Sequence, residues 1–297
     1  MKIAVIGAGK WGLALYNAIK INHKDIVISS RTKRDIDGFV TQKEALNAEY
    51  IIVAIAAQAI GQWVSQNNFR KDQKFLIASK GIDVKSTKFL NDILEEKIDS
   101  KNLAYLSGPS FATEVLKKLP CAVVISSKDK TTADDFALLF PPFMKAYVSD
   151  DVIGAEVCGA YKNIIAIASG ICDGLALGNN ARASLIARGL VEICRFGKFF
   201  GAKDETFIGL SGAGDLFLTA SSNLSRNYRV GYALAKGKKL NEILDELGEV
   251  AEGVWTTKAV VKISKKYEIY TPIATEIDAI LEGKEIKSSL ESLLKRR

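Results

Sequence analysis

The stretch Ile3-Ala4-Val5-Ile6-Gly7-Ala8-Gly9-Lys10-Trp11-Gly12 decides the fold of the N-terminal half. Its first four residues form a short apolar run typical of a buried strand, and residues 13–19 continue with the apolar spacing of a helix. Between them, the glycines follow the G-x-G-x-x-G spacing that joins a strand to a helix in dinucleotide-binding sheets. Gly7 permits the tight turn, Gly9 lets a pyrophosphate approach the backbone, and Gly12 lets the helix pack closely on the strand.

This loop predicts a site for a nicotinamide dinucleotide, NAD or NADP, at Gly7, Gly9, Lys10, Trp11 and Gly12. NAD-specific proteins usually carry an acidic residue about 20 residues further on, at the end of the second strand. This chain has Ser29-Ser30-Arg31-Thr32 there, so no carboxylate repels a 2′-phosphate and Arg31 can pair with it. We therefore expect NADPH to be accepted. Alternatively, Arg31 is a solvated residue after a strand.

Short apolar runs alternate with helical patterns in the first half, which predicts a doubly wound parallel (Rossmann) sheet in the α/β class. The predicted strands are residues 2–6, 26–29, 50–55, 74–78, 103–106, 121–126 and 146–149, and the predicted helices are 10–20, 58–66, 86–97 and 130–140. Only helical spacing follows, at 153–174, 179–200, 227–236, 240–246, 254–266 and 272–282. We expect a dinucleotide-binding domain at 1–150 and an all-helical substrate domain at 151–297.

Composition limits the compartment and the chemistry. The four cysteines form no CxxC pair, which favours a reducing compartment, and the N-terminus leaves no room for a signal peptide. No apolar run approaches the roughly 18 residues of a membrane span. We expect a cytoplasmic protein that binds no nucleic acid, because the excess charge of +7 is spread along the chain. The single histidine, His23, lies in a polar stretch, so proton transfer falls to other residue types and no metal site is expected.

Polar residues follow two predicted strands, at Lys80-Gly81 and at Ser107-Gly108-Pro109-Ser110. Both loops would lie at the carboxyl ends of strands, where open α/β sheets bind ligands. Lys162 precedes the apolar run at 164–168, so it sits early in a strongly apolar helix. Burial there would lower its pKa towards the value that a general base needs. The alternative is a lysine near a helix end whose ammonium group reaches water.

Seven segments in order resemble the NAD(P)-dependent glycerol-3-phosphate dehydrogenases of bacteria, along nearly the whole chain. They are GAGKWGLAL (7–15), ASKGI (78–82), SGPSFA (107–112), GAYKN (159–163), LSGAGDL (210–216), SRNYRVG (225–231) and AEGV (251–254). The resemblance implies an oxidoreductase that interconverts dihydroxyacetone phosphate and sn-glycerol 3-phosphate for glycerophospholipid synthesis in lipid metabolism. Its substrate is a small phosphorylated molecule.

The resemblance also implies roles for residues in the matching segments. Lys162 is similar to the family's proton-transferring lysine, and Lys80 to a second lysine that contacts cofactor and substrate. The implied substrate contacts are Lys80, Gly108, Ser110, Lys162, Asp215, Ser225, Arg226 and Asn227. The implied cofactor contacts are Lys80, Ala112, Arg226, Val250 and Glu252, alongside Trp11 and Arg31.

Elementary chemistry supports these roles. Ketone reduction leaves a negative oxygen that needs a nearby cation and a proton, and Lys162 can supply both. Lys80 beside it would favour the neutral amine through repulsion between like charges. Arg226 offers a planar fork that suits phosphate. Asp215 either binds a substrate hydroxyl or orients Lys162. The alternative is that Gly212 and Gly214 form only a turn between helices, with Asp215 as the N-cap of the helix that follows.

Some features depart from the family, and other functions remain open. The segment at 32–49 is short, Ala56 stands where a proline is usual, and Tyr161 replaces a leucine. A related dehydrogenase acting on another small phosphorylated or carboxylated substrate is the second reading. An NADPH-binding sensor or scaffold without turnover is the third, and Lys80, Lys162 and Arg226 argue against it because a sensor needs no proton donor. Leucine-rich faces in the helical half permit a homodimer without requiring one.

Overall fold

The computed structural model describes residues 2–248 and 250–295. The chain forms two compact units. The first contains Met1–Ser79 and Leu90–Ala155, and the second contains Lys80–Phe89 and Glu156–Arg297. The division at residue 150 stays a prediction, and sequence periodicity gave no sign that the short segment Lys80–Phe89 belongs with the helices.

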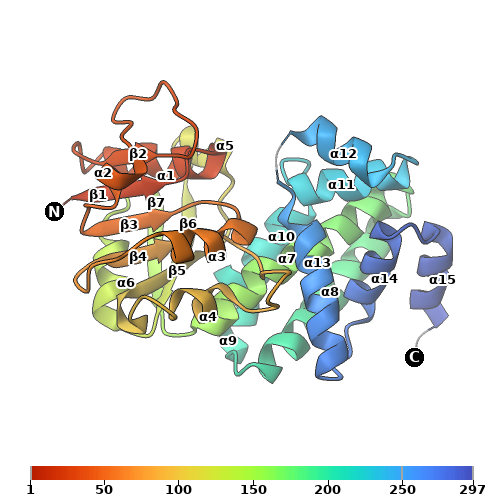
Figure 1. The fold of residues 1–297 in the computed structure, drawn as a ribbon. Helices are drawn as coiled ribbons and strands as arrows, with labels where there is room; N and C mark the ends of the chain where they lie inside the picture. Colours follow the sequence, from red (N-terminus) through yellow and green to blue (C-terminus); the bar gives the residue numbers. More distant parts are fainter. Residues whose placement is uncertain (1, 249, 296–297) are drawn as a thin grey trace. The chain divides into compact units, whose positions relative to one another are not determined.

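The first unit is built on a seven-stranded sheet with the order β2-β1-β3-β4-β5-β6-β7 (Figure 1). The strands are β1 (Ile3–Ile6), β2 (Val27–Ser29), β3 (Tyr50–Val53), β4 (Lys74–Ile77), β5 (Leu103–Ser107), β6 (Cys121–Ser127) and β7 (Met144–Ser149). All seven predicted strands are present. The sheet is not wholly parallel, however, because β6 runs antiparallel to β5 while β7 is parallel to β6. The predicted doubly wound sheet is therefore confirmed as mostly parallel, and the parallel direction expected of β6 against β5 was wrong.

Helices cover both faces of the sheet, as a doubly wound fold requires. They are α1 (Lys10–Lys20), α2 (Gln42–Ala45), α3 (Ala57–Gln66), α4 (Leu90–Leu94), α5 (Ala112–Leu116) and α6 (Lys130–Ala137), with the 3₁₀ turn η1 (Ser100–Asn102). Alternate strand residues enter opposite cores. Val5 packs in the core under α1, α5 and α6, whereas Ala4 and Ile6 pack in the core under α2, α3 and α4.

The second unit is helical in its described residues (Figure 1). It contains most of α7 (Val152–Gly174), then α8 (Gly178–Phe199), α9 (Asp204–Ile208), α10 (Asp215–Ala220), α11 (Arg226–Ala235), α12 (Leu240–Leu247), α13 (Glu252–Lys266), α14 (Pro272–Leu281) and α15 (Ile286–Lys295), with the π-helical turn η2 (Leu210–Gly214). The six helices predicted here are present. The short helices α2, α5, α9 and α10, together with α15, were missed, and the helix expected at 86–97 is limited to Leu90–Leu94.

The helix α7 is the core of the helical unit. It is 23 residues long and apolar enough by mean hydropathy to cross a membrane, but 94% of its apolar window is buried inside the fold. Sequence reading did not single it out because Glu156 and Lys162 interrupt its apolar residues. Burial of all its faces explains why nearly every position is apolar.

Two glycines let α11 pack against α7 at backbone contact. A Cβ atom at Gly231 would lie 1.9 Å from the carbonyl oxygen of Ile167, and one at Gly170 would lie 2.0 Å from that of Tyr228. The Tyr228 hydroxyl also donates a hydrogen bond of 2.6 Å to Asp173 Oδ2. Because both helices carry predicted site residues, this contact fixes the spacing between those residues.

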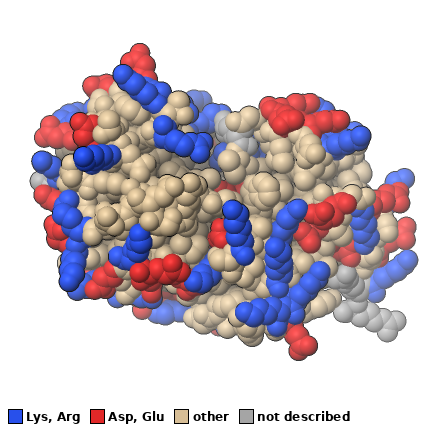
Figure 2. Space-filling view, in the orientation of Figure 1, with Lys and Arg blue, Asp and Glu red and all other residues tan. Residues whose placement is uncertain are grey.

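Surface charges are mixed. On the face drawn in Figure 2, Lys and Arg side chains are interspersed with Asp and Glu. Ion pairs near the surface include Lys238 with Glu246 at 2.7 Å and Lys128 with Glu95 at 2.6 Å. Pairs of this kind contribute little to stability because water screens them. On this face the basic excess is spread among acidic neighbours.

Candidate functional site

The glycine loop between β1 and α1 packs against backbone atoms at Gly7 and Gly12, and it has open space at Gly9. Gly7 has φ +111°, and a Cβ there would lie 2.4 Å from the Ala54 carbonyl oxygen. A Cβ at Gly12 would lie 1.8 Å from the Gly7 carbonyl oxygen. At Gly9, by contrast, an added Cβ would meet no atom within 4 Å. Gly7 and Gly12 therefore shape the turn, and the space over Gly9 is free for a ligand.

This open space lies at the start of α1. Gly9 is the N-cap residue, and no side chain caps the helix there. A helix N-terminus offers backbone N–H groups and partial positive charge to an anion. The loop also sits between β1 and β3, where the strand order reverses, and such points bind ligands in open sheets. The loop thus fits the pyrophosphate of a nicotinamide dinucleotide.

Other predicted cofactor residues of the first unit lie at the same edge of the sheet. Lys10 and Trp11 are the first two residues of α1, and Arg31 follows β2 with an exposed side chain. Because β2 is parallel to β1, Arg31 and the glycine loop lie at neighbouring carboxyl ends. Ala112 begins α5, after the loop that follows β5.

That loop carries two predicted substrate residues. Gly108 has φ +98°, and a Cβ there would approach the Ala122 carbonyl oxygen to 3.1 Å. The Ser110 hydroxyl donates a hydrogen bond of 3.2 Å to the Gly108 carbonyl oxygen. Glycine is therefore needed at position 108 for the backbone turn itself, whatever else the residue contacts.

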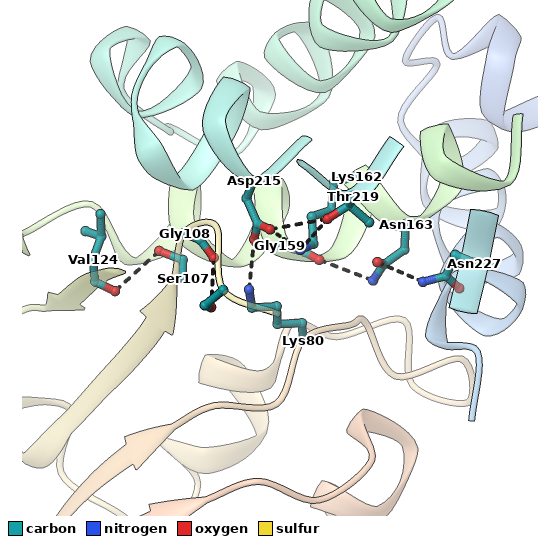
Figure 3. A network of polar contacts seen from close by, with 11 residues as sticks. Lys80, Ser107, Gly108, Val124, Gly159, Lys162, Asn163, Asp215, Thr219 and Asn227 are labelled. Carbon is teal, nitrogen blue, oxygen red and sulfur yellow. Dashed lines mark hydrogen bonds and ion pairs between the residues drawn. The ribbon is translucent and has the colours of Figure 1, made fainter. Parts of the chain in front are cut away.

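A buried carboxylate joins two lysines in the helical unit (Figure 3). Asp215 is 1% exposed and accepts a hydrogen bond of 2.8 Å from Lys80 Nζ at Oδ2. Its other oxygen, Oδ1, accepts a short hydrogen bond from Lys162 Nζ. Lys162 lies in the interior of α7 and is 7% exposed, so the alternative of a lysine reaching water from a helix end is wrong. The structure therefore brings all three predicted catalytic residues together.

The electrostatics of this cluster favour a titratable Lys162. Burial disfavours its ammonium form, and the charge of Lys80 adds to that effect, while Asp215 opposes both. The pKa of Lys162 falls from 10.5 to about 7 as a result. Burial alone would raise the pKa of Asp215, but the two lysines outweigh burial and lower it. Asp215 is therefore an anion at neutral pH, and Lys162 can gain or lose a proton there.

The turn before Asp215 has an unusual geometry. Residues Leu210–Gly214 form the π-helical turn η2, and α10 begins at Asp215 with Gly214 as its N-cap residue. A Cβ at Gly212 would lie 2.1 Å from the Phe207 carbonyl oxygen, so the turn packs closely on α9. The alternative in which Asp215 serves only as an N-cap is wrong. The π-turn holds Asp215 so that its side chain meets the lysines, as such turns often do at functional sites.

A second polar chain links α7, α11 and α13. Asn227 Nδ2 donates a hydrogen bond of 2.9 Å to Asn163 Oδ1, next to Lys162 in sequence. Asn227 Oδ1 accepts one of 2.9 Å from the backbone N–H of Gly253. The predicted substrate residue Asn227 therefore lies in the buried network of the helical unit.

The neighbours of Asn227 occupy the first turn of α11. Ser225 is the N-cap residue, and its hydroxyl oxygen accepts from the Tyr228 N–H at 3.3 Å. Arg226 is the first residue of the helix and is half-buried. Glu252 begins α13 and is half-buried, whereas Val250 is exposed. Val250 takes part in none of the hydrogen bonds described above.

Sequence reasoning did not select two polar side chains of this network, Thr219 and Asn163. Thr219 Oγ1 lies 3.1 Å from Lys162 Nζ and 3.3 Å from Asp215 Oδ1. Its spacing of four residues from Asp215 would place both on one helix face, but the helix α10 was itself not predicted. Asn163 adjoins Lys162 and could have been noted as a polar residue in an apolar stretch.

Comparisons with known proteins agree along the whole chain. Residues 151–291 match the family described as NAD-dependent glycerol-3-phosphate dehydrogenase C-terminus, and residues 39–133 match the corresponding N-terminus family. The chain is 59% identical over 296 residues to glycerol-3-phosphate dehydrogenase (NAD(P)+) of a Nitratiruptor species, covering 100% of this chain and 99% of that protein. It is 58% identical to the protein of that name from Campylobacter lari, covering 99% and 98%.

A solved structure gives the same assignment. The crystal structure of glycerol-3-phosphate dehydrogenase from Coxiella burnetii superposes with a TM-score of 0.93 at 32% identity, and 99% of each chain is covered. Sequence identity at this level over the full length, together with the shared fold, assigns the chain to a single family. The chain belongs to the NAD(P)-dependent glycerol-3-phosphate dehydrogenases.

Proposed function

We propose that this chain catalyses the interconversion of dihydroxyacetone phosphate and sn-glycerol 3-phosphate with NADPH or NADH. Family membership supports the reaction. The observation that carries the chemistry is the buried Lys162, whose pKa of about 7 matches a group that exchanges protons at neutral pH. The product would supply the backbone of glycerophospholipids.

In this proposal Lys162 is the proton donor and acceptor. A nicotinamide cofactor, when bound, supplies or accepts the hydride. In reduction the ammonium form of Lys162 stabilises the developing alkoxide and gives it a proton. In oxidation the neutral amine takes the proton from the substrate hydroxyl. Because the pKa is about 7, both forms are populated near neutral pH.

Lys80 and Asp215 set the charge around Lys162. The Asp215 carboxylate accepts from both lysines, which fixes the direction of the Lys162 side chain. Lys80 provides a second positive charge beside the site, which would also favour the negatively charged oxygen of the transition state. The orientation of the Lys162 amino group is thus determined before substrate binds.

The first turn of α11 is our candidate for the phosphate clamp. Arg226 provides a guanidinium that can bind two phosphate oxygens. The Ser225 hydroxyl accepts from a backbone N–H and retains its own proton to donate. Asn227 Nδ2 uses one N–H for Asn163, and its amide group has a second N–H that would donate to a phosphate oxygen in this proposal. Gly108 and Ser110 are further substrate contacts in this proposal, as the family resemblance implies.

The residues of the first unit fit the dinucleotide. Gly7, Gly9, Lys10, Trp11 and Gly12 would hold the pyrophosphate at the start of α1, and Arg31 would pair with a 2′-phosphate. Ala112, Val250 and Glu252 are further cofactor contacts in this proposal, as are Lys80 and Arg226. The open space over Gly9 is the structural support for this placement.

The deciding experiment measures the decrease in NADPH absorbance after purified protein is mixed with NADPH and dihydroxyacetone phosphate. Wild-type protein is expected to oxidise NADPH rapidly, and the Lys162→Met variant is expected to bind NADPH without turnover. Lys262→Met, at an exposed position of α13, is the matched control and is expected to keep full activity. Absence of oxidation by the wild type despite NADPH binding would refute the substrate, and an active Lys162→Met variant would refute the role of the lysine.

We also propose a cytoplasmic homodimer. All four cysteines are free thiols, which suits a reducing compartment. The helical unit exposes large apolar side chains, among them Ile208, Phe217 and Trp255, which support association with a second copy. Sedimentation equilibrium would measure the mass, and a mass of one chain at micromolar concentration would contradict the dimer.

A further inference from the structure

A partly open cavity in the helical unit is lined by α7, α8, α14 and α15. Its volume is about 500 Å³, within the range of small-molecule sites. Most of its lining is apolar, with Ile171 from α7, Leu185 from α8, Ile277 from α14 and Leu290 from α15 among the contributors. None of the residues assigned above to the substrate or the cofactor lines it. The cavity is therefore a feature separate from the proposed catalytic cluster.

Apolar side chains remain exposed around this cavity. Leu177, Val191, Tyr270 and Leu294 all line it and are between 39% and 76% exposed. Exposed apolar side chains that gather at a concave site, rather than scattering singly, indicate a binding surface. The cavity thus combines an apolar interior with an apolar rim that water reaches.

The charged groups on α8 make the opening basic. Arg188 lines the cavity, is exposed, and forms no ion pair within the described part of the chain. Arg195 also lines it, donating from Nη1 to the Tyr270 carbonyl oxygen at 2.7 Å with its guanidinium over the Tyr270 ring. Two arginines on one helix face attract an anion.

The acidic groups in the wall are already engaged. Glu192 is 2% exposed and accepts hydrogen bonds from the Tyr161 hydroxyl at 2.7 Å and from the N–H groups of Ile273 and Ala274 at 2.8 Å. Glu276 pairs with Lys284 at 2.6 Å. Both carboxylates therefore have partners, and Arg188 is the exposed charged group of the lining that a ligand can meet.

One buried polar group in the wall is unsatisfied. The Ser289 hydroxyl, 1% exposed, has no hydrogen-bond partner among the described residues, although it belongs to the cavity lining on α15. A buried hydroxyl normally finds a partner, so this one marks a place where ligand or water atoms would be expected.

We propose that this cavity binds the hydrocarbon chain of a single-chain amphiphile with an anionic head, such as a long-chain carboxylate. The chain lies among the aliphatic side chains of α7, α8, α14 and α15, and the carboxylate pairs with Arg188 at the opening. An entirely apolar ligand would leave Arg188 unused, and a compact polar anion would leave the aliphatic lining in contact with water. The proposal goes beyond the dehydrogenase reaction and does not depend on it.

The test is calorimetric titration of the intact protein with straight-chain carboxylates from hexanoate to hexadecanoate, each below its micelle concentration. One molecule is expected to bind per chain. Each added methylene is expected to raise affinity by up to about fourfold until the chain fills the cavity, after which affinity levels off. Continued growth without a plateau, or binding that does not saturate, would overturn the proposal because adsorption to a surface has no length limit.

Two pairs of variants locate the site. Ser184→Phe places a ring on the cavity side of α8 and is expected to abolish binding, whereas Ala183→Phe, at an exposed position outside the lining, is expected to retain it. Arg188→Glu is expected to weaken dodecanoate binding at least tenfold and to leave dodecanol binding unchanged, with Lys262→Glu as the charge control. Equal binding by all four variants would overturn the proposal. The proposal would also be overturned if the wild-type protein bound no carboxylate and Ser184→Phe changed the oligomeric state. A second copy of the chain would then be the occupant of the cavity.

Discussion

Lys80 Nζ lies 2.8 Å from Asp215 Oδ2, although 135 residues separate the two in sequence. Lys162 binds the other oxygen of the same carboxylate. One buried anion is thus shared by two ammonium groups, while burial and mutual repulsion act against the charge on Lys162. A change to Lys80 and a change to Asp215 are therefore expected to move the pKa of Lys162 in opposite directions.

The pH dependence of the wild-type enzyme follows from this pKa. Below about 7, Lys162 carries the proton that reduction needs, and above about 7 it is the neutral amine that oxidation needs. The rate of reduction is expected to fall as pH rises through about 7, and the rate of oxidation is expected to rise over the same interval. Steady-state kcat measured in both directions from pH 5 to 10 tests this. Parallel profiles in the two directions would contradict the role of Lys162.

Substitution of Lys80 or Asp215 is expected to shift the pH at which these rates change, called here the limb of the pH profile. Lys80→Met removes the repulsion and is expected to move the limb to higher pH. Asp215→Asn removes the attraction and is expected to move it to lower pH. Both variants are expected to lower kcat, so the diagnostic readout is the position of the limb. Displacement of both limbs in the same direction would show that another group titrates.

Arg226→Ala is expected to raise KM for dihydroxyacetone phosphate by roughly 10- to 100-fold, the range for losing a charge-assisted hydrogen bond. Arg229→Ala is the control, because Arg229 lies exposed on the same helix. Inhibition by inorganic phosphate is expected to weaken in parallel with substrate binding. If Arg226→Ala keeps the wild-type KM, the phosphate is bound elsewhere.

If Arg31 binds the 2′-phosphate, Arg31→Ala is expected to reduce the preference for NADPH over NADH by roughly tenfold or more, because NADH lacks that phosphate. Arg34→Ala, in the same exposed segment, controls for the general loss of positive charge. Dissociation constants from cofactor fluorescence give the ratio directly. An unaltered NADPH to NADH ratio would remove Arg31 from 2′-phosphate recognition.

Gly9→Ala is expected to lower NADPH affinity while leaving the thermal stability of the protein unchanged. The added methyl meets no protein atom within 4 Å and φ at Gly9 is −73°, so thermal stability is expected to stay close to wild type. The same methyl would occupy the space where the pyrophosphate approaches the backbone, so NADPH affinity is expected to fall at least tenfold. Unimpaired NADPH binding would place the pyrophosphate away from Gly9.

Gly231→Ala is expected to destabilise the helical unit by about 2 kcal/mol or more, because its methyl would overlap the Ile167 carbonyl oxygen. Gly61→Ala is the contrasting control. Gly61 lies within α3, where the nearest atom to an added Cβ is 4.0 Å away, and alanine there is expected to stabilise by about 0.5–1 kcal/mol. Urea unfolding of each variant measures the difference. Equal stability of Gly231→Ala and wild type would show that α7 and α11 can separate without cost.

Sequence motifs selected side chains that the structure brings into contact, whereas periodicity missed part of the backbone path around them. The glycine loop, Lys80, Lys162 and Asp215 were all selected from motifs, and the structure joins the last three through one carboxylate. Short helices such as α9 and α10 were missed because five or six residues do not complete a hydrophobic period. The antiparallel β6 was read as parallel because its sequence has the continuous apolar run that is typical of a parallel strand buried on both faces.

By itself the sequence determined what depends on neighbours along the chain. The glycine spacing set the turn between β1 and α1, and apolar periodicity set the long helices and the buried strands. Tertiary structure alone decided the rest. It brought Lys80 to Asp215 across 135 residues, it moved the pKa of Lys162 to about 7 by burying it beside both, and it opened the cavity between α8 and α15. Desolvation, charge interaction and packing volume depend on which atoms meet in space, and sequence order does not contain that information.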